Sequence, residues 1–115
     1  MWPTLQRRTQ FQLVYRQGRK RTSPHLVVFR LDCDGEPCVG FVASRKVGGA
    51  VVRNRAKRLM RVAFRTIEST LEPAWFVLVA RTGIDQCRSP DVAAELRRLM
   101  AEEPAARADE PEVKG

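Results

Sequence analysis

The stretch Trp75-Phe76-Val77-Leu78-Val79-Ala80 is an unbroken run of apolar side chains, bounded by Pro73 and Gly83. A strand with one face in water alternates apolar and polar residues, whereas a strand covered on both faces is apolar throughout. We therefore expect this run to form a central strand of a sheet, with helices packed over it.

Two further strands are predicted upstream of this run. Residues 25–31 are rich in β-branched and aromatic side chains, and Cys38 to Ser44 form a second such segment. Between them, Asp32 to Pro37 has turn composition with Asp34-Gly35 at its centre. We expect the two strands to pair as an antiparallel hairpin, and a short extra strand is possible beside the bend at Val47-Gly48-Gly49-Ala50.

A first helix is predicted near the N-terminus. Thr9 forms a candidate capping box with Gln12, and the helix continues to about Gln17. Gly18 is expected to end it in a left-handed conformation. The basic segment Arg19-Lys20-Arg21 that follows is expected to be a loop.

Two more helices follow from spacing and capping residues. The second is predicted over about Val52 to Ser69, where apolar residues recur with helical spacing. Its apolar stripe consists of Val52, Ala56, Leu59, Met60, Ala63 and Ile67. The third is expected to begin after Ser89, a candidate N-cap followed by Pro90, and to end at Pro104.

These elements give the order α-β-β-(β)-α-β-α, an α+β fold in which a small sheet of three to four strands packs with three helices in two layers. We expect residues 1–103 to form this single domain and residues 104–115, rich in Ala, Glu and Pro, to be a disordered acidic tail. No apolar run is long enough to span a membrane, and the N-terminus lacks the apolar core of a secretory signal. We therefore expect a cytoplasmic protein without membrane contacts.

Positive charge is concentrated in the first part of the chain. Of 115 residues, 21 are Lys or Arg and 13 are Asp or Glu, which gives a net charge of +8. Residues 1–65 carry 15 basic and 3 acidic side chains, a net of +12, and residues 66–115 carry 6 and 10, a net of −4. Because eight basic residues and no acidic one lie between Val39 and Arg65, we expect a polyanionic partner. A plain solvated surface and a membrane-surface helix are the alternatives.

The basic residues of the second predicted helix repel one another. Arg53, Lys57, Arg61 and Arg65 are spaced four apart without an acid between them, and each like-charge pair destabilises a helix by about 0.2–0.5 kcal/mol. Arg53 also lies in the first turn, where the helix dipole disfavours a cation. Bound phosphates would reverse both effects, so we infer a phosphate-binding face, with Asn54 and Arg58 beside it and Arg55 on the far flank of the apolar stripe.

Three aromatic residues are candidates for a base-stacking surface. Phe11 and Tyr15 lie one helical turn apart, and Phe29 lies in the middle of a predicted strand. Exposed rings beside cations stack on unpaired bases, and the candidate cations are Arg19, Lys20, Arg45 and Lys46. Packing in the core is the alternative for each ring.

The sequence lacks a convincing catalytic set for a protein nuclease. His25 is the only histidine, and the carboxylates lie in the turn at 32–36 or in the C-terminal half. Three cysteines and one histidine do not match a zinc clip, so we expect free thiols, with a Cys33–Cys38 cross-link on oxidation as the alternative. We expect no catalytic residue, no metal ligand and no cofactor bound by this chain.

Three segments resemble the bacterial ribonuclease P protein component. They are residues 11–19, with a Phe-x-x-Val-Tyr helix, residues 39–48, which contain Ser44-Arg45-Lys46-Val47-Gly48, and residues 50–61, in which Arg53-Asn54-Arg55 opens the basic helix. The resemblance covers about residues 5–100. It implies an α+β fold with a left-handed β-α-β crossover, although the general rule for such connections is right-handed.

The resemblance also implies a function. Proteins of that family are the small subunit of a ribonucleoprotein endonuclease that removes the 5′ leader from precursor tRNA, in which the RNA subunit, with its bound Mg²⁺, is catalytic. The implied contacts with the RNA subunit are Arg53, Asn54, Arg55, Lys57, Arg58, Arg61 and Arg65. The implied leader-binding cleft consists of Phe11, Tyr15, Phe29, Arg19, Arg45 and Lys46. No obligate protein partner is expected, and the alternatives are a ribosomal or RNA-chaperone protein and an autonomous small nuclease.

Overall fold

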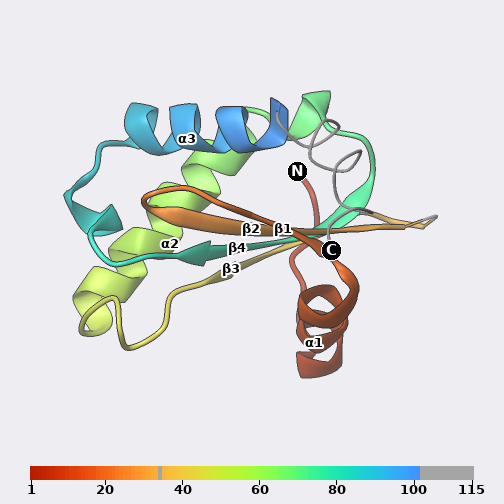
Figure 1. Cartoon of the computed structure of the whole chain (residues 1–115), viewed down its shortest axis with the longest axis horizontal. Helices are drawn as coiled ribbons and strands as arrows, with labels where there is room; N and C mark the ends of the chain where they lie inside the picture. Colours follow the sequence, from red (N-terminus) through yellow and green to blue (C-terminus); the bar gives the residue numbers. More distant parts are fainter. Residues whose placement is uncertain (34, 102–115) are drawn as a thin grey trace, which may run out of the picture.

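The computed structural model describes residues 1–33 and 35–101, so the predicted tail at 104–115 and the helix end at Pro104 lie outside the described residues. The order of the elements is α-β-β-β-α-β-α, which confirms the predicted fold class (Figure 1). In chain order they are α1 (Arg8–Gln17), β1 (Arg19–Thr22), β2 (Leu26–Asp32), β3 (Cys38–Val42), α2 (Ala50–Arg65), the 3-10 helix η1 (Glu68–Thr70), β4 (Ala74–Ala80), the 3-10 helix η2 (Ile84–Gln86) and α3 (Ser89–Ala101). Within the described part of the chain, no helix has the length and apolar character needed to cross a bilayer.

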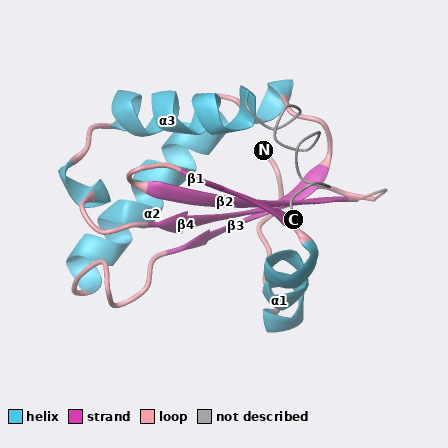
Figure 2. Cartoon of the chain, in the orientation of Figure 1, coloured by secondary structure: helices cyan, strands magenta, loops and turns pink. Residues whose placement is uncertain are grey.

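The four strands form one mixed sheet in the order β1-β2-β4-β3 (Figure 2). β4 lies between β2 and β3, and Phe76, Val77 and Leu78 are almost fully buried, which confirms the predicted central strand. The predicted hairpin of β2 with β3 is wrong, because β4 pairs antiparallel with β2 and parallel with β3. Turn residues show where a chain changes direction, but the apolar run of β4 takes the interior position between the two earlier strands.

The parallel pairing of β3 with β4 makes β3-α2-β4 a β-α-β crossover between neighbouring strands. Its left-handed sense stays a prediction from the resemblance. This connection requires α2 to lie over one face of the sheet. The buried side chains of α2 pack there against side chains of β3 and β4.

The fourth strand is β1, which the sequence analysis assigned to a loop. β1 pairs antiparallel with β2, and Lys20 lies opposite Phe29 in the register. Charged side chains are common on edge strands, where they discourage pairing with other chains, so the basic composition of Arg19-Lys20-Arg21 concealed a strand. The segment where an extra strand seemed possible is instead a turn over residues 45–47.

Helices cover the two faces of the sheet unequally. α2 and α3 pack on one face, whereas α1 lies alone on the other, at one end of the sheet (Figure 1). The larger core contains an aromatic cluster in which Phe64 contacts Trp2, Phe41 and Phe76. Phe64, at the flank of the predicted stripe of α2, was missed in the sequence analysis although it is only 1% exposed.

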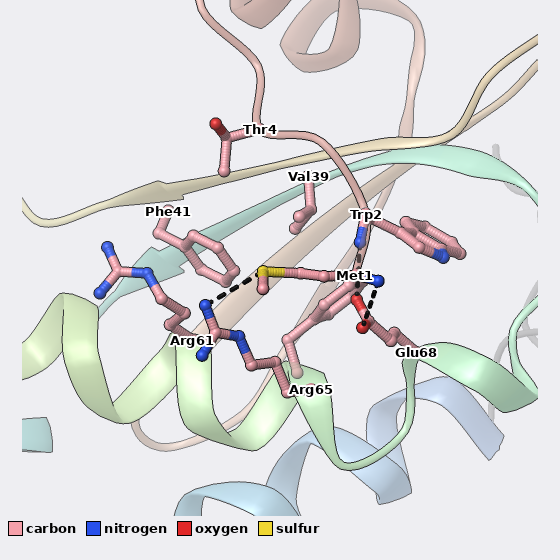
Figure 3. Close-up of a pocket in the computed structure, with 9 residues that line it drawn as sticks. Met1, Trp2, Thr4, Val39, Phe41, Arg61, Arg65 and Glu68 are labelled. Atoms are coloured by element: carbon pink, nitrogen blue, oxygen red, sulfur yellow. Dashed lines mark hydrogen bonds and ion pairs between the residues drawn. The ribbon is translucent and has the colours of Figure 1, made fainter.

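The N-terminal segment lies along the outer edge of β3. The amide of Leu5 donates to the carbonyl of Val39, and the amide of Val39 donates to the carbonyl of Pro3. The amide of Trp2 donates to Glu68 at 3.1 Å, at a small pocket of about 40 Å³ between this segment and α2 (Figure 3). The segment thus covers part of an edge that would otherwise expose unpaired backbone groups.

The predicted last residue of α1, Gln17, is confirmed, but the predicted caps at the two ends are wrong. The cap is built by Gln10, whose side-chain oxygen accepts from the amides of Gln6 and Arg7 at 3.1 and 2.9 Å, so Thr9 is not the N-cap. Gly18 has φ −79°, which is not left-handed. A Cβ at Gly18 would lie 2.5 Å from the carbonyl oxygen of Val14 and 2.9 Å from that of Arg30. Glycine is therefore required by close packing of backbone rather than by a left-handed turn.

We predict that Gly18→Ala destabilises the protein by about 1–3 kcal/mol, because backbone must move to admit the methyl group. Gly35→Ala is the matched control, since a Cβ there meets nothing within 4 Å, and its effect should stay within about 0.5 kcal/mol. Urea unfolding followed by circular dichroism measures both free energies of unfolding. Equal values for the two variants would contradict the close approach at Gly18.

Candidate nucleic-acid interface

The orientation of α2 is set by its buried side. Ala56, Leu59, Met60, Ala63 and Phe64 pack into the core, so the remaining side chains face outward or flank the sheet. Asn54, Arg55, Arg58 and Arg65 are exposed, whereas Arg53, Lys57 and Arg61 are half-buried. The structure therefore places the predicted cations on the side of α2 away from its packing residues, and their contact with RNA stays a prediction.

The cations of α2 are not neutralised by acidic side chains. Within residues 1–33 and 35–101, no ion pair involves α2. Arg55 Nε instead donates to the carbonyl of Asp85 at 2.8 Å, and the Arg61 guanidinium lies 5.6 Å from the ring centroid of Phe41. Both contacts fix a side chain without cancelling its charge.

The outer surface of α2 is hollowed in two places. One hollow of about 580 Å³ is lined by Asn54, Lys57, Arg58, Arg61, Val62 and Arg65. A second of about 530 Å³ is lined by Arg55, Arg58, Leu59, Val62, Arg88, Ser89 and Pro90, so it extends from α2 to the start of α3. Arg58 borders both hollows. These concave basic surfaces suit the phosphates of a folded nucleic acid.

Two residues differ from the sequence-based set. Arg53 is half-buried in the first turn of α2 and lines neither hollow. Arg88 was missed, because it precedes the third predicted helix and no periodic pattern connects it to α2. Only the packing of α3 beside α2 brings it to Arg55 and Arg58.

A second candidate surface lies on the face of the sheet that carries α1. The rings of Tyr15 and Phe29 meet edge to face with centroids 4.9 Å apart, and Lys20 Nζ lies 5.9 Å from the Phe29 centroid. Tyr15 is 39% exposed. Burial raises the pKa of Tyr15, so its hydroxyl remains protonated at neutral pH and able to donate a hydrogen bond. The exposed ring of Tyr15 therefore packs against the ring of Phe29, which in turn lies beside the ammonium group of Lys20.

The other residues predicted for this surface do not all lie on it. Phe11 is half-buried and packs on the sheet, where a Cβ at Gly40 would lie 2.4 Å from its ring. Arg19 lies in register with Arg30, whose guanidinium lies 5.7 Å from the ring centroid of Phe76 in the larger core. Arg19 is therefore on the opposite face from Tyr15, and its Nη2 pairs with Asp32 at 3.4 Å. Because neighbouring residues of a strand point to opposite faces, Lys20 is the cation that accompanies the rings.

Arg45 and Lys46 are exposed in the turn that follows β3. Between this turn and the aromatic pair, Val27, Val79 and Val42 form a cross-strand row and are half-buried. α1 covers only one end of this face, as Figure 1 shows. We call this row, together with Tyr15, Phe29 and Lys20, the open sheet face.

Known proteins are similar to this chain over most of its length. A family model described as ribonuclease P matches residues 3–103. The chain belongs to the ribonuclease P protein family. Ribonuclease P protein components from Exiguobacterium sp. and Gluconacetobacter diazotrophicus are 36% and 38% identical to it over 97 and 100 residues, which are 84% of this chain in each case and 85% and 86% of the relatives.

Solved structures of ribonuclease P proteins share the fold. The protein from Staphylococcus aureus matches with a TM-score of 0.77 at 21% identity, over 88% of this chain and 94% of that chain. The protein from Thermotoga maritima matches with a TM-score of 0.74 at 24% identity, over 84% and 93% of the two chains. Family membership gives this ribonuclease P protein an RNA-binding role in the 5′ processing of tRNA.

We predict that Lys57→Ala/Arg58→Ala weakens RNA binding and lowers the slope of log K against log salt by about 1.4–1.8, since each lost phosphate contact removes about 0.7–0.9. Arg97→Ala/Arg98→Ala on α3 removes the same charge away from both hollows, and should leave the slope within about 0.5 of the parent. Filter binding across a salt series measures both slopes. The same change in slope for both variants would show that net charge, not this surface, binds the RNA.

Proposed function

We propose that the two hollows of α2 bind the RNA subunit of ribonuclease P and that the open sheet face binds the single-stranded 5′ leader of precursor tRNA. The observation that carries this proposal is the row of cations on α2 without an acidic partner among the described residues. We expect no obligate protein partner for the binding of these two RNAs. We expect this binding to take place in the cytoplasm.

The assignment of α2 to the RNA subunit follows from shape and charge. The helix runs for 16 residues, which is about 24 Å at 1.5 Å per residue and enough to meet several phosphates of a folded RNA. Within the part of the chain that the structure describes, no carboxylate lines either hollow. Arginine forks bind phosphate oxygens in pairs, so Arg55, Arg58 and Arg61 give directional as well as electrostatic contacts.

The assignment of the open sheet face to the leader follows from its rings. Single-stranded RNA is bound by stacking its bases on exposed aromatic side chains, and Tyr15 is the exposed member of its pair. Lys20 lies beside the rings, and Arg45 and Lys46 lie at the other end of the row of valines. A strand of RNA lying between them would place bases on apolar side chains and phosphates near cations.

We assign the chemical step to the RNA subunit and its Mg²⁺ rather than to this chain. A protein nuclease needs a base, an acid or metal-binding carboxylates at the reacting phosphate. Among the described residues, those that line the two hollows offer only guanidinium, ammonium, amide, hydroxyl and apolar groups. Such a surface can hold RNA in place, and it supplies no group for proton transfer at neutral pH.

Reconstitution tests this division of labour against its alternatives. Purified protein, its cognate RNA subunit and precursor tRNA are combined at low Mg²⁺, with each component also assayed alone. We expect correct 5′ maturation only when protein and RNA subunit are both present. Cleavage by the protein alone would indicate an autonomous nuclease, and RNA binding without any gain in maturation would favour a ribosomal or RNA-chaperone protein.

We predict that Tyr15→Ala weakens binding of leader-containing precursor tRNA to the holoenzyme by about 1–3 kcal/mol, as expected for the loss of one stacked base. Binding of mature tRNA should be unchanged, because it has no leader. Tyr15→Phe keeps the ring and should retain most of the affinity for the precursor. Equal losses for precursor and mature tRNA would return Tyr15 to a packing role.

A further inference from the structure

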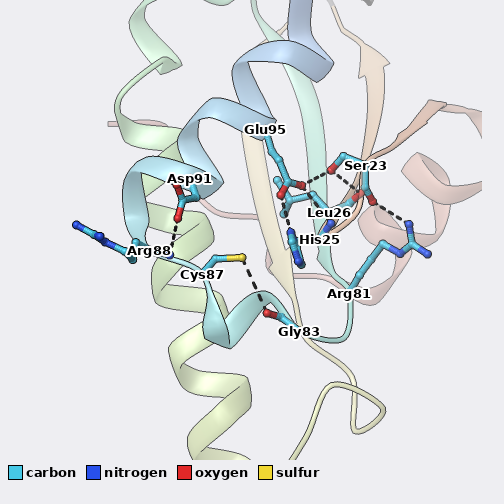
Figure 4. Close-up of polar contacts among 9 residues, drawn as sticks. All are labelled: Ser23, His25, Leu26, Arg81, Gly83, Cys87, Arg88, Asp91 and Glu95. Atoms are coloured by element: carbon cyan, nitrogen blue, oxygen red, sulfur yellow. Dashed lines mark hydrogen bonds and ion pairs between the residues drawn. The ribbon is translucent and has the colours of Figure 1, made fainter.

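A polar cluster lies on the far side of the molecule from the open sheet face, where α3 meets the sheet. It joins the β1–β2 connection, which contains Ser23 and His25, to Glu95 of α3 and to Cys87 just before that helix (Figure 4). These residues come together only in the folded chain, because His25 and Glu95 are 70 positions apart. No part of the proposed RNA contacts uses them.

Glu95 is held firmly in this cluster. Its Oε1 accepts from the hydroxyl of Ser23 at 2.6 Å and from the amide of His25 at 3.1 Å, and its Oε2 lies 2.6 Å from His25 Nδ1. Burial raises the pKa of Glu95, but the hydrogen bonds from Ser23 and His25 outweigh burial and lower the pKa below its usual value. The carboxylate oxygens are thus held in place by Ser23 and His25, where they can serve as oxygen ligands.

Cys87 completes a set of three different ligand types. Its Sγ lies 3.9 Å from the carbonyl oxygen of Gly83, a long contact. The ligand atoms offered by His25, Cys87 and Glu95 all lie within 4.8 Å of one another. Zinc bonds of 2.0–2.3 Å in a tetrahedral site place ligand atoms about 3.3–3.6 Å apart. The most widely separated ligand atoms therefore need to approach by about an ångström at most, whereas His25 Nδ1 and Glu95 Oε2, which are 2.6 Å apart in a hydrogen bond, need to move apart if both bind the ion.

We propose that Cys87, His25 and Glu95 bind one zinc-like transition-metal ion, with a water molecule as the fourth ligand. The His25 side chain is 32% exposed and that of Glu95 is 15% exposed, so the site has a path to solvent. Sulfur and imidazole ligands select zinc and similar ions over Mg²⁺. The site is thus distinct in chemistry from the Mg²⁺ that we assign to the RNA subunit.

Electrostatics favour a metal over a reactive thiol at this position. The carboxylates of Glu95, Asp91 and Asp85 place negative charge near Cys87, which disfavours a thiolate nucleophile there. A divalent cation reverses that balance, because the same negative charges attract it. On binding, the Cys87 thiol releases its proton to solvent and its sulfur forms the bond to the metal.

The metal would act as a clamp on the fold. It would link three parts of the chain: the connection between β1 and β2, the segment that follows η2, and α3. η2 is also the element whose Asp85 carbonyl accepts the hydrogen bond from Arg55. No metal ligand was predicted from the sequence, because cysteine spacing does not reveal residues brought together from positions 25, 87 and 95.

Cobalt titration tests the site directly, since a thiolate bound to Co²⁺ gives a charge-transfer absorption band in the near ultraviolet. The parent is the untagged full chain with Cys33→Ser and Cys38→Ser, stripped of metal with a chelator. We expect a band that saturates at one Co²⁺ per chain and is displaced by Zn²⁺. Absence of the band in the parent, at a millimolar excess of Co²⁺, would overturn the proposal.

Variants of the parent separate the ligands from background. Cys87→Ser should abolish the band, and His25→Gln and Glu95→Gln should each weaken Co²⁺ binding about tenfold or more. Glu72→Gln, an exposed acid elsewhere, is the matched control and should bind as the parent does. A band that persists in Cys87→Ser would overturn the proposal.

Thermal unfolding provides a second measurement where a variant folds poorly. Zn²⁺ should raise the melting temperature of the parent, because a ligand bound only by the folded state stabilises it. No such rise should occur in Cys87→Ser. A rise of equal size in both proteins would show that the ion binds elsewhere.

Discussion

The packing of α2 on the sheet is the interaction on which the structure and its proposed RNA-binding surface both depend. Burial of Leu59, Met60 and Phe64 contributes about 1.5–3 kcal/mol each, as an upper estimate. The three like-charge pairs along the helix cost about 0.2–0.5 kcal/mol each. Burial therefore outweighs repulsion, and the helix keeps its cations outward without bound RNA. The buried side of α2 fixes the position of the helix, and its cations therefore remain on the outer side.

Elements with a strong local signal could be predicted from the sequence, whereas pairing partners could not. The apolar run of β4 and the spacing of α2 identified both elements, because burial on two faces and burial on one face leave different patterns. The pairing of β3 with β4 was missed, since no local pattern states which strands are neighbours. β1 was missed because its basic residues suit an edge strand and a loop equally.

In the candidate site too, residues related by local spacing were predicted, whereas residues brought together by packing were not. The cations of α2 were predicted because one helix carries them, and helical spacing relates their positions. Arg19 was placed with the aromatic rings because its strand was not recognised, and strand alternation then puts it on the opposite face from Lys20. Arg88 and the cluster of Ser23, His25, Cys87 and Glu95 depend on how α3 docks, which no periodicity in the sequence encodes.

The two proposed RNA contacts lie on opposite faces of the sheet, and the turn over residues 45–47 connects them along the chain. In the proposed holoenzyme, the RNA subunit holds both this chain and the body of the precursor tRNA, so the leader binds as an intramolecular step. Tethering of this kind raises the effective concentration of the leader to about the millimolar range. A single exposed ring such as Tyr15, worth about 1–3 kcal/mol in stacking, is then enough to bias the leader toward the open sheet face. On the proposed assignment, a surface with few exposed rings is therefore sufficient for the leader, and the larger positive charge, which has no acidic partner among the described residues, lies on α2 for the RNA subunit.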